Sequence, residues 1–314
     1  MNTHPLDFEL AITDLENKVA ELSAKRPSED PLLTAARQDL EKERKALYSN
    51  LTPWQRVQIA RHPTRPYFLD YIEACVTDFV ELHGDRLFGD DKAMPAGIGR
   101  IGGHRCIIIG QQKGRDVKEN VLRNFGSPHP EGYRKALRLM RMAEKFHLPV
   151  VCIIDTPGAY PGVGAEERHI AEAIAVNLRE MMALKTQIIA IVIGEGGSGG
   201  ALGIGVADRV LMLENAYYSV ISPEGCAAIL WKHRKHAPEA AAALKLTAPD
   251  LQELGLIDGV IPEPMGGAHR DREAIYASMI ETIASTLEAL KKTPLPKLLE
   301  DRYAKFRGMG VFSE

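Results

Sequence analysis

The chain has 314 residues, 45% of them hydrophobic, and a formal net charge of −3. This size and apolar content suffice for one large domain or two ordinary ones, and the near balance of charge excludes bulk attraction to nucleic acid or to an acidic membrane surface. The four cysteines are widely spaced without a C-x-x-C pair, which excludes a zinc ribbon and indicates a reducing compartment. No signal-like or membrane-spanning apolar run is present in the sequence, so we expect a cytoplasmic protein.

The first 82 residues are predicted to be helical. Residues 7–50 are highly charged, and their apolar side chains recur at intervals of three, four and seven, with a proline-rich break at 26–31. This pattern predicts a helical hairpin whose apolar stripe packs either on its own protomer or on another subunit. A helix start is predicted at Thr52-Pro53, and an amphipathic helix over 67–82.

A polar, glycine-containing loop over 83–91 leads into the first predicted strands, 96–101 and 105–111. Two glycines between these strands indicate a hairpin. Asp90 and Asp91 in the loop are adjacent acids. They are interpreted as a solvated turn, with a metal or proton-transfer pair as the alternative.

The helix predicted over 131–146 has one basic face. Its members recur at intervals of four, three and four residues: Arg134, Arg138, Arg141 and Lys145. A basic helix face is ordinarily a solvated surface, and the alternative is contact with phosphate or with an acidic partner.

Two apolar runs, over 149–156 and 188–193, each lead into a glycine-rich turn. Continuous apolar runs are typical of strands buried on both faces of a parallel sheet, and a long helix is predicted between them over 165–184. Parallel crossovers bring equivalent strand ends to the same side of a sheet. The turns at 157–164 and 194–200 are therefore expected to face one crevice.

The second turn admits several interpretations, because five of the seven residues from 194 to 200 are glycine and a short helix is predicted over 201–206. Backbone N–H groups at such a turn can stabilise negative charge, which favours an oxyanion hole. The turn also matches the dinucleotide motif G-x-G-x-x-G, but the space before the next predicted strand is too short for a crossover helix. It matches the G-x-S-x-G elbow with Ser198 as nucleophile as well, although no downstream histidine stands in a distinctive context. A purely structural turn is the remaining alternative.

The remainder of the chain is predicted to alternate strands and helices. Strands are expected at 209–213, 218–221 and 256–261, and helices at 226–232, 245–254 and 271–292. The segment 262–269 is interpreted as a linker with His269 as a loop residue, since no second histidine stands at metal-ligand spacing from it.

Seven strings, in order along nearly the whole chain, resemble the carboxyltransferase alpha subunit of bacterial acetyl-CoA carboxylase. They are RHPTRPY (61–67), GDRLFGDD (84–91), NFGSPHPEGYRKA (124–136), DTPGAYPG (155–162), GEGGSGGAL (194–202), SVISPEGCA (219–227) and PEPMGGAH (262–269). The resemblance implies an α/β fold of the crotonase type (ClpP/crotonase-like), with stacked strand–turn–helix units and an N-terminal helical extension. We expect a helical region over 1–82, the carboxyltransferase core over 83–269 and a helical segment over 270–314.

The activity implied by the resemblance is the first step of fatty acid biosynthesis. CO2 passes from carboxybiotin, carried on the biotin carboxyl carrier protein, to acetyl-CoA to form malonyl-CoA. The implied partners are a zinc-bearing beta subunit, in an alpha2beta2 heterotetramer, and biotin carboxylase; no metal is expected in this chain. The alternatives are another crotonase-fold acyl-CoA enzyme, such as a hydratase or decarboxylase, and a non-catalytic scaffold.

The site implied by the resemblance consists of backbone groups. The N–H groups of Gly199 and Gly200 are expected to form the oxyanion hole on the biotin side, while the beta subunit serves acetyl-CoA. The biotin enolate itself can remove the methyl proton of acetyl-CoA, so no general base is nominated. The residues expected to shape the biotin pocket are Gly196, Gly197, Gly158 and Gly162.

Overall fold

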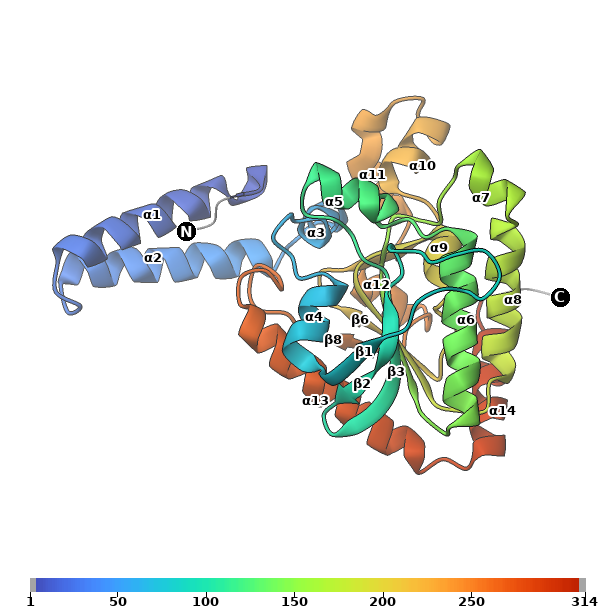
Figure 1. The fold of residues 1–314 in the computed structure, drawn as a ribbon. Coiled ribbons are helices and arrows are strands. Elements are labelled where there is room, and N and C mark those ends of the chain that lie inside the picture. Colours follow the sequence, from blue (N-terminus) through green and yellow to red (C-terminus); the bar gives the residue numbers. More distant parts are fainter. Residues whose placement is uncertain (1–3, 311–314) are drawn as a thin grey trace.

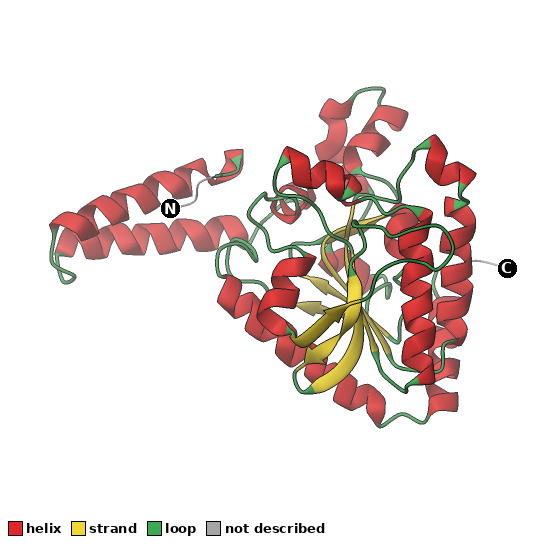
Figure 2. Ribbon diagram, in the orientation of Figure 1, coloured by secondary structure: helices red, strands yellow, loops and turns green. Residues whose placement is uncertain are grey.

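A computed structural model describes residues 4–310 of the chain. A mixed β-sheet lies at its centre with helices packed around it, and a helical hairpin projects from one side (Figures 1 and 2). The strands of the described residues are β1 (Thr77–Glu81), β2 (Ala96–Ile101), β3 (His104–Gly110), β4 (Val150–Thr156), β5 (Ile188–Gly197), β6 (Arg209–Leu213), β7 (Tyr217–Ser219) and β8 (Gly259–Ile261).

The helices supply the outer layers and the projecting hairpin. The α-helices of residues 4–310 are α1 (Leu10–Lys25), α2 (Pro31–Tyr48), α3 (Pro53–Ala60), α4 (Phe68–Cys75), α5 (Val117–Leu122), α6 (Pro130–Lys145), α7 (Val163–Glu167), α8 (Ile170–Ala183), α9 (Ser198–Leu202), α10 (Pro223–Leu230), α11 (Ala237–Ala243), α12 (Ala248–Glu253), α13 (Arg272–Lys291) and α14 (Leu295–Arg307). None of them is long and apolar enough to cross a lipid bilayer.

The strand order in the sheet is β1-β2-β3-β4-β5-β6-β8, and β7 pairs separately with the end of β5. The first three strands are antiparallel, with the predicted glycine hairpin between β2 and β3, whereas the strands from β3 to β8 are parallel. Every residue of β4 and β5 is buried. Helices cover both faces of a parallel sheet, which explains the continuous apolar runs that predicted these strands.

β5 is longer than predicted and changes partner along its length. Residues 189–192 pair with β6, and residues 195–197 pair with β7. The glycines up to Gly197 therefore belong to the strand, and the turn into α9 begins only there. The helix predicted over 201–206 accordingly begins three residues earlier, at Ser198.

Two further helix predictions were partly wrong. The helix predicted over 67–82 ends at Cys75, because the following residues pair with β2 as the edge strand β1. The long helix predicted over 165–184 is interrupted at His169, whose φ of 64° is left-handed and cannot continue an α-helix. α5 and α11 were not predicted, whereas α14 lies within the helical segment predicted over 270–314.

The N-terminal hairpin is confirmed, and its apolar stripe packs between its own two helices. Ile12 of α1 and Leu33 and Leu40 of α2 are buried there. Arg270 in the linker before α13 ties the hairpin to the body, donating to Glu9 at 3.1 Å and to Glu16 at 2.9 Å.

The boundaries predicted at residues 82 and 269 remain predictions, although contacts cross both of them. β1 belongs to the central sheet, and α14 is anchored to the start of β6 through Arg302. The Arg302 guanidinium is fully buried and lies 2.7 Å from a carboxylate oxygen of Asp208. It also donates to the carbonyl oxygens of Met181 and Leu184, at the end of α8.

Candidate functional site

The two glycine-rich turns after β4 and β5 come together, as predicted. A Cβ added to Gly200 would lie 2.5 Å from the carbonyl carbon of Gly158 and would overlap the backbone of Ala159. A Cβ on Gly197 would likewise overlap the backbone carbonyl of Pro157. Only glycine allows this approach of two backbones, so the packing itself requires these residues.

The first turn of α9 offers backbone N–H donors at this contact. Gly197 is its N-cap and makes no side-chain cap hydrogen bond, so the N–H groups of Gly199 and Gly200 have no intrahelical acceptor. The Gly200 carbonyl oxygen is fixed from behind. It accepts from Gln111 Nε2 at 2.9 Å and from the Tyr133 hydroxyl at 3.1 Å.

The other predicted site glycines occupy distinct places. Gly196 lies inside β5, where an added Cβ would be 2.8 Å from a Tyr218 ring carbon. Gly158 has a φ of +153° and open space at its Cβ position, whereas Gly162 is the N-cap of α7 and contacts the Tyr160 ring. Gly158 and Gly162 are half-buried beside the contact between the turns. Their part in binding biotin, and that of Gly196 and Gly197, remains a prediction.

Ser198 is exposed and has a φ of +49°, as a nucleophile elbow would require. The downstream histidines make their hydrogen bonds and ring contacts elsewhere. His236 contacts Glu239, and the His269 ring stacks on His62 with 3.8 Å between ring centroids. Within residues 4–310, Ser198 has no hydrogen bond to a histidine base, so the geometry gives no support to the hydrolase alternative.

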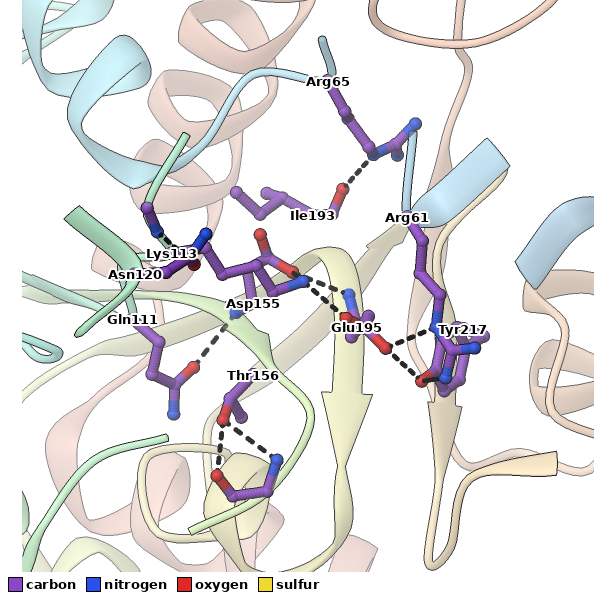
Figure 3. A network of polar contacts seen from close by, with 12 residues as sticks. Arg61, Arg65, Gln111, Lys113, Asn120, Asp155, Thr156, Ile193, Glu195 and Tyr217 are labelled. Atoms are coloured by element: carbon purple, nitrogen blue, oxygen red, sulfur yellow. Dashed lines mark hydrogen bonds and ion pairs between the residues drawn. The ribbon is translucent and has the colours of Figure 1, made fainter. Parts of the chain in front are cut away.

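A buried polar network lies behind the turn, at the carboxyl ends of β3, β4 and β5 (Figure 3). Lys113 Nζ lies 2.6 Å from Asp155 Oδ1 and 2.7 Å from Glu195 Oε1. The other oxygen of Glu195 accepts from Arg61 Nε at 2.7 Å and from the Tyr217 hydroxyl at 2.5 Å. One carboxylate thus joins α3, β7 and the loop after β3.

The network also fixes the backbone of β5. The Asp155 carboxylate accepts from the Glu195 N–H at 2.9 Å, and the Asp155 N–H donates to the Gln111 side chain, which holds Gly200. Further along, the guanidinium of Arg65 donates to the carbonyl oxygen of Ile193 at 2.8 Å. The strand that ends in the oxyanion turn is therefore held by side chains along its last residues.

The charges of the network are set by burial and mutual pairing. Burial opposes ionisation of Glu195, but the charges of Lys113 and Arg61 outweigh it and lower the pKa of Glu195 to about 2. Burial has the largest effect on Asp155 and raises its pKa, although the charge of Lys113 and the hydrogen bond from the Glu195 N–H lower it.

Reasoning from the sequence missed this network. Asp155 and Glu195 are acidic residues at the ends of otherwise apolar strands, and that is the local signal that could have revealed them. Asp90 and Asp91 do not form a paired site. Asp90 contacts Lys135 Nζ at 2.6 Å, and no group of His, Cys, Asp or Glu side chains in the described part of the chain has the arrangement of a metal site.

Solved structures of other proteins share this architecture. Transcarboxylase 12S aligns with a TM-score of 0.58 and 22% identity, over 72% of this chain and 41% of that one. A Pseudomonas malonate decarboxylase hetero-tetramer aligns with a TM-score of 0.51 and 19% identity, over 70% of this chain and 90% of that one. At such identities the likeness concerns the fold alone. It confirms the predicted crotonase-like fold, which this chain shares with acyl-CoA carboxyltransferases.

Sequence comparisons identify the family to which the chain belongs. The family model "Acetyl co-enzyme A carboxylase carboxyltransferase-like" matches residues 5–310. The acetyl-coenzyme A carboxylase carboxyl transferase subunit alpha of Geobacter metallireducens is 55% identical over 314 residues, covering 99% of both chains. That of Burkholderia multivorans is 56% identical over 321 residues, covering 100% of this chain and 98% of the relative. The chain therefore belongs to the family of acetyl-CoA carboxylase carboxyltransferase alpha subunits, a component of a biotin-dependent transferase.

Proposed function

We propose that this chain supplies the biotin side of the carboxyltransferase site, with the N–H groups of Gly199 and Gly200 as its oxyanion hole. The observation that carries the proposal is the uncapped start of α9, where the Gly200 carbonyl oxygen, next along the backbone from the Gly200 N–H, is held by Gln111 and Tyr133. Donors that are held in place before the reaction stabilise developing charge without reorganisation. Gly158 and Gly162, on the facing turn, would border the same pocket.

The chemistry proposed for this site is the transfer of CO2 from carboxybiotin, on its carrier protein, to acetyl-CoA. Loss of CO2 places negative charge on the ureido oxygen of biotin, and backbone N–H groups suit that charge without a reactive side chain. The enolate then takes the methyl proton of acetyl-CoA, and the resulting carbanion attacks CO2 to give malonyl-CoA. The protein's own task is to bind, orient and stabilise the enolate oxygen.

We further propose that the site is completed by a beta subunit, which supplies the acetyl-CoA side. Val163 follows the first turn and is 75% exposed, and Leu202, at the end of α9, is 42% exposed. Exposed apolar side chains beside a site favour coverage by a partner. The zinc of that subunit, the alpha2beta2 assembly, the contact with biotin carboxylase and the cytoplasmic location belong to the same proposal.

The direct test is malonyl-CoA formation from acetyl-CoA and carboxybiotin. We expect no turnover with this chain alone, and turnover when the matching beta subunit is added. Assembly is verified by gel filtration in the same samples. A verified complex without turnover would contradict the proposed transfer and favour the alternative, an acyl-CoA hydratase or decarboxylase. Those activities are assayed without biotin.

A separate prediction concerns Ser198. Ser198→Ala keeps the backbone donors and removes only an exposed hydroxyl, so kcat of the complex should stay within about twofold of the wild-type value. A serine nucleophile would instead lose roughly six orders of magnitude in kcat. Steady-state kinetics distinguish these outcomes, and a loss of that size would revive the hydrolase alternative.

A further inference from the structure

A groove on the face formed by α6 and α8 contains none of the residues of the proposed oxyanion hole. It lies between these helices and the loop over 84–89, and its volume is about 790 Å³. α6 and α8 run side by side in Figure 1, and the predicted basic face of α6 lines the groove through Arg134, Arg138 and Arg141. Lys145, the fourth member of that face, lies instead over the Phe146 ring.

The loop that forms one wall is held rigidly by Asp85. One carboxylate oxygen accepts from the N–H groups of Leu87, Phe88 and Gly89 at 3.0, 2.8 and 2.9 Å, and the other accepts from Arg134 Nε at 2.8 Å. Burial opposes ionisation of Asp85, but these hydrogen bonds lower its pKa to about 2. The loop therefore presents Arg86 in a fixed, left-handed conformation with a φ of 66°.

Several arginines from separate elements converge on the groove. Its guanidinium groups belong to Arg86, Arg134, Arg138, Arg141 and Arg168, and its acids are Asp85 and Glu172. Arg134 pairs with Asp85, and Arg168 pairs with Glu131.

Two of these arginines are not balanced by an acid. Within residues 4–310, Arg86 and Arg138 make no ion pair, and their hydrogen bonds go to the carbonyl oxygens of His83 and Gly84. Burial, and then the charge of Arg86, lowers the pKa of Arg138. The charges of Asp85 and Asp90 also act on Arg138, but neither acid forms an ion pair with it in the described residues. Two adjacent guanidinium groups outside ion pairs favour an anion, and the planar guanidinium suits phosphate.

The groove also contains a buried acceptor. Asn177 of α8 is 1% exposed and donates through Nδ2 to the carbonyl oxygens of Tyr133 and Gly203. Its Oδ1 is buried and has no hydrogen-bond partner in the structure, so a ligand N–H that reached it would satisfy an orphaned acceptor. Apolar side chains of Leu137, Ala173 and Val176 line the same groove.

We propose that this groove binds a phosphorylated nucleotide, with the phosphates on Arg86, Arg138 and Arg141 and an amino group of the base directed at Asn177. Its volume is that of a small-molecule site. A concave pocket that combines apolar walls, a buried acceptor and guanidinium groups fits a nucleotide better than an acidic protein segment. The nucleotide is either free or the nucleotide end of a coenzyme A thioester.

Calorimetric titration with adenosine 3′,5′-bisphosphate tests binding, using the full-length chain and its complex with the beta subunit. We expect saturable binding to both, at least about tenfold tighter than that of pyrophosphate, because base and phosphates each contribute. Absence of binding at millimolar concentration to either sample, or equal affinity for pyrophosphate, overturns the proposal.

The structure offers a matched pair of variants. Arg141 and Arg179 contact the two oxygens of Glu180 at 2.9 and 2.8 Å, but only Arg141 lines the groove. Both side chains are well exposed, at 57% and 73%, so neither charge reversal should unfold the protein. Arg141→Glu should weaken binding of the bisphosphate by about tenfold or more, whereas Arg179→Glu should leave it nearly unchanged. If the two variants weakened binding of the bisphosphate equally, the binding would reflect the overall charge of the protein, and the proposed site would be refuted.

The two sources of the nucleotide are distinguished by turnover of the complex. If the site holds the nucleotide end of the thioester, Arg141→Glu raises KM for acetyl-CoA with little change in kcat. If the site holds a free nucleotide, KM is unchanged although the bisphosphate affinity falls. The titrations need no turnover, so failure of this proposal is separate from failure of the proposed transfer.

Discussion

Gly200→Val in the complex with the beta subunit should lower kcat for malonyl-CoA formation by about two to three orders of magnitude, the usual effect of losing an oxyanion donor. The first atom of the new side chain would lie 2.5 Å from the Gly158 carbonyl carbon and would overlap Ala159. Because these are backbone atoms that cannot rotate away, the two turns must separate. The N–H groups at the start of α9 would then leave the position in which they can stabilise the biotin enolate.

The control for this variant is Gly89→Val. Nothing lies within 4 Å of a Cβ at Gly89, whose φ is outside the left-handed region, so the same change should be tolerated there. Gel filtration should show that both variants still assemble with the beta subunit. KM for acetyl-CoA should change little in Gly200→Val, since the beta subunit is proposed to bind that substrate. A wild-type kcat in the Gly200→Val complex would show that this turn does not form the oxyanion hole.

Lys113→Met should lower the free energy of unfolding by about 3–5 kcal/mol, because it leaves the buried Asp155 carboxylate without its cation. The Lys113 side chain is 12% exposed, and those of Asp155 and Glu195 are 3% and 9% exposed. Urea unfolding of the full chain measures the change. Lys25→Met is the control: Lys25 and Glu21 form an exposed pair on α1, with side chains 68% and 66% exposed. An exposed pair of that kind is screened by solvent, so its loss should change the stability far less than the loss of Lys113.

The loss in Lys113→Met should depend on pH with a definite sign. Without the lysine, burial raises the folded-state pKa of Asp155 further above its unfolded value, whereas Glu195 keeps its ion pair with Arg61. A carboxyl group with a raised folded-state pKa destabilises the folded protein as pH rises from its unfolded-state pKa to its folded-state pKa. The stability lost by Lys113→Met relative to the wild type should therefore be larger at about pH 8 than at about pH 5. Adding Asp155→Asn removes one unpaired charge and should recover part of the stability. A pH-independent deficit with no such recovery would show that the network is not an electrostatic unit.

Much of the scaffold could be predicted because its signals are local. The apolar runs of β4 and β5, the hairpin stripe and the Thr52 cap are each encoded within a few consecutive residues. The glycine-rich turns and their meeting also followed from the sequence, since parallel strands must end on the same side. The family could be recognised because several long strings occur in order.

Tertiary structure decided the features that depend on distant residues. β1 replaced part of a predicted helix because pairing with β2 at the sheet edge outweighed its helical periodicity. Arg61 and Glu195 are 134 residues apart, and only the crossovers of the sheet bring them within hydrogen-bond distance. The arginine groove likewise needed the 84–89 loop to place Arg86 beside α6. The sequence alone determined the buried central strands, the turns and the glycines that allow backbone contact, because those depend on local periodicity and steric freedom. Only the packing of elements that are distant in the sequence decided which charged side chains lie together behind the turn and in the groove.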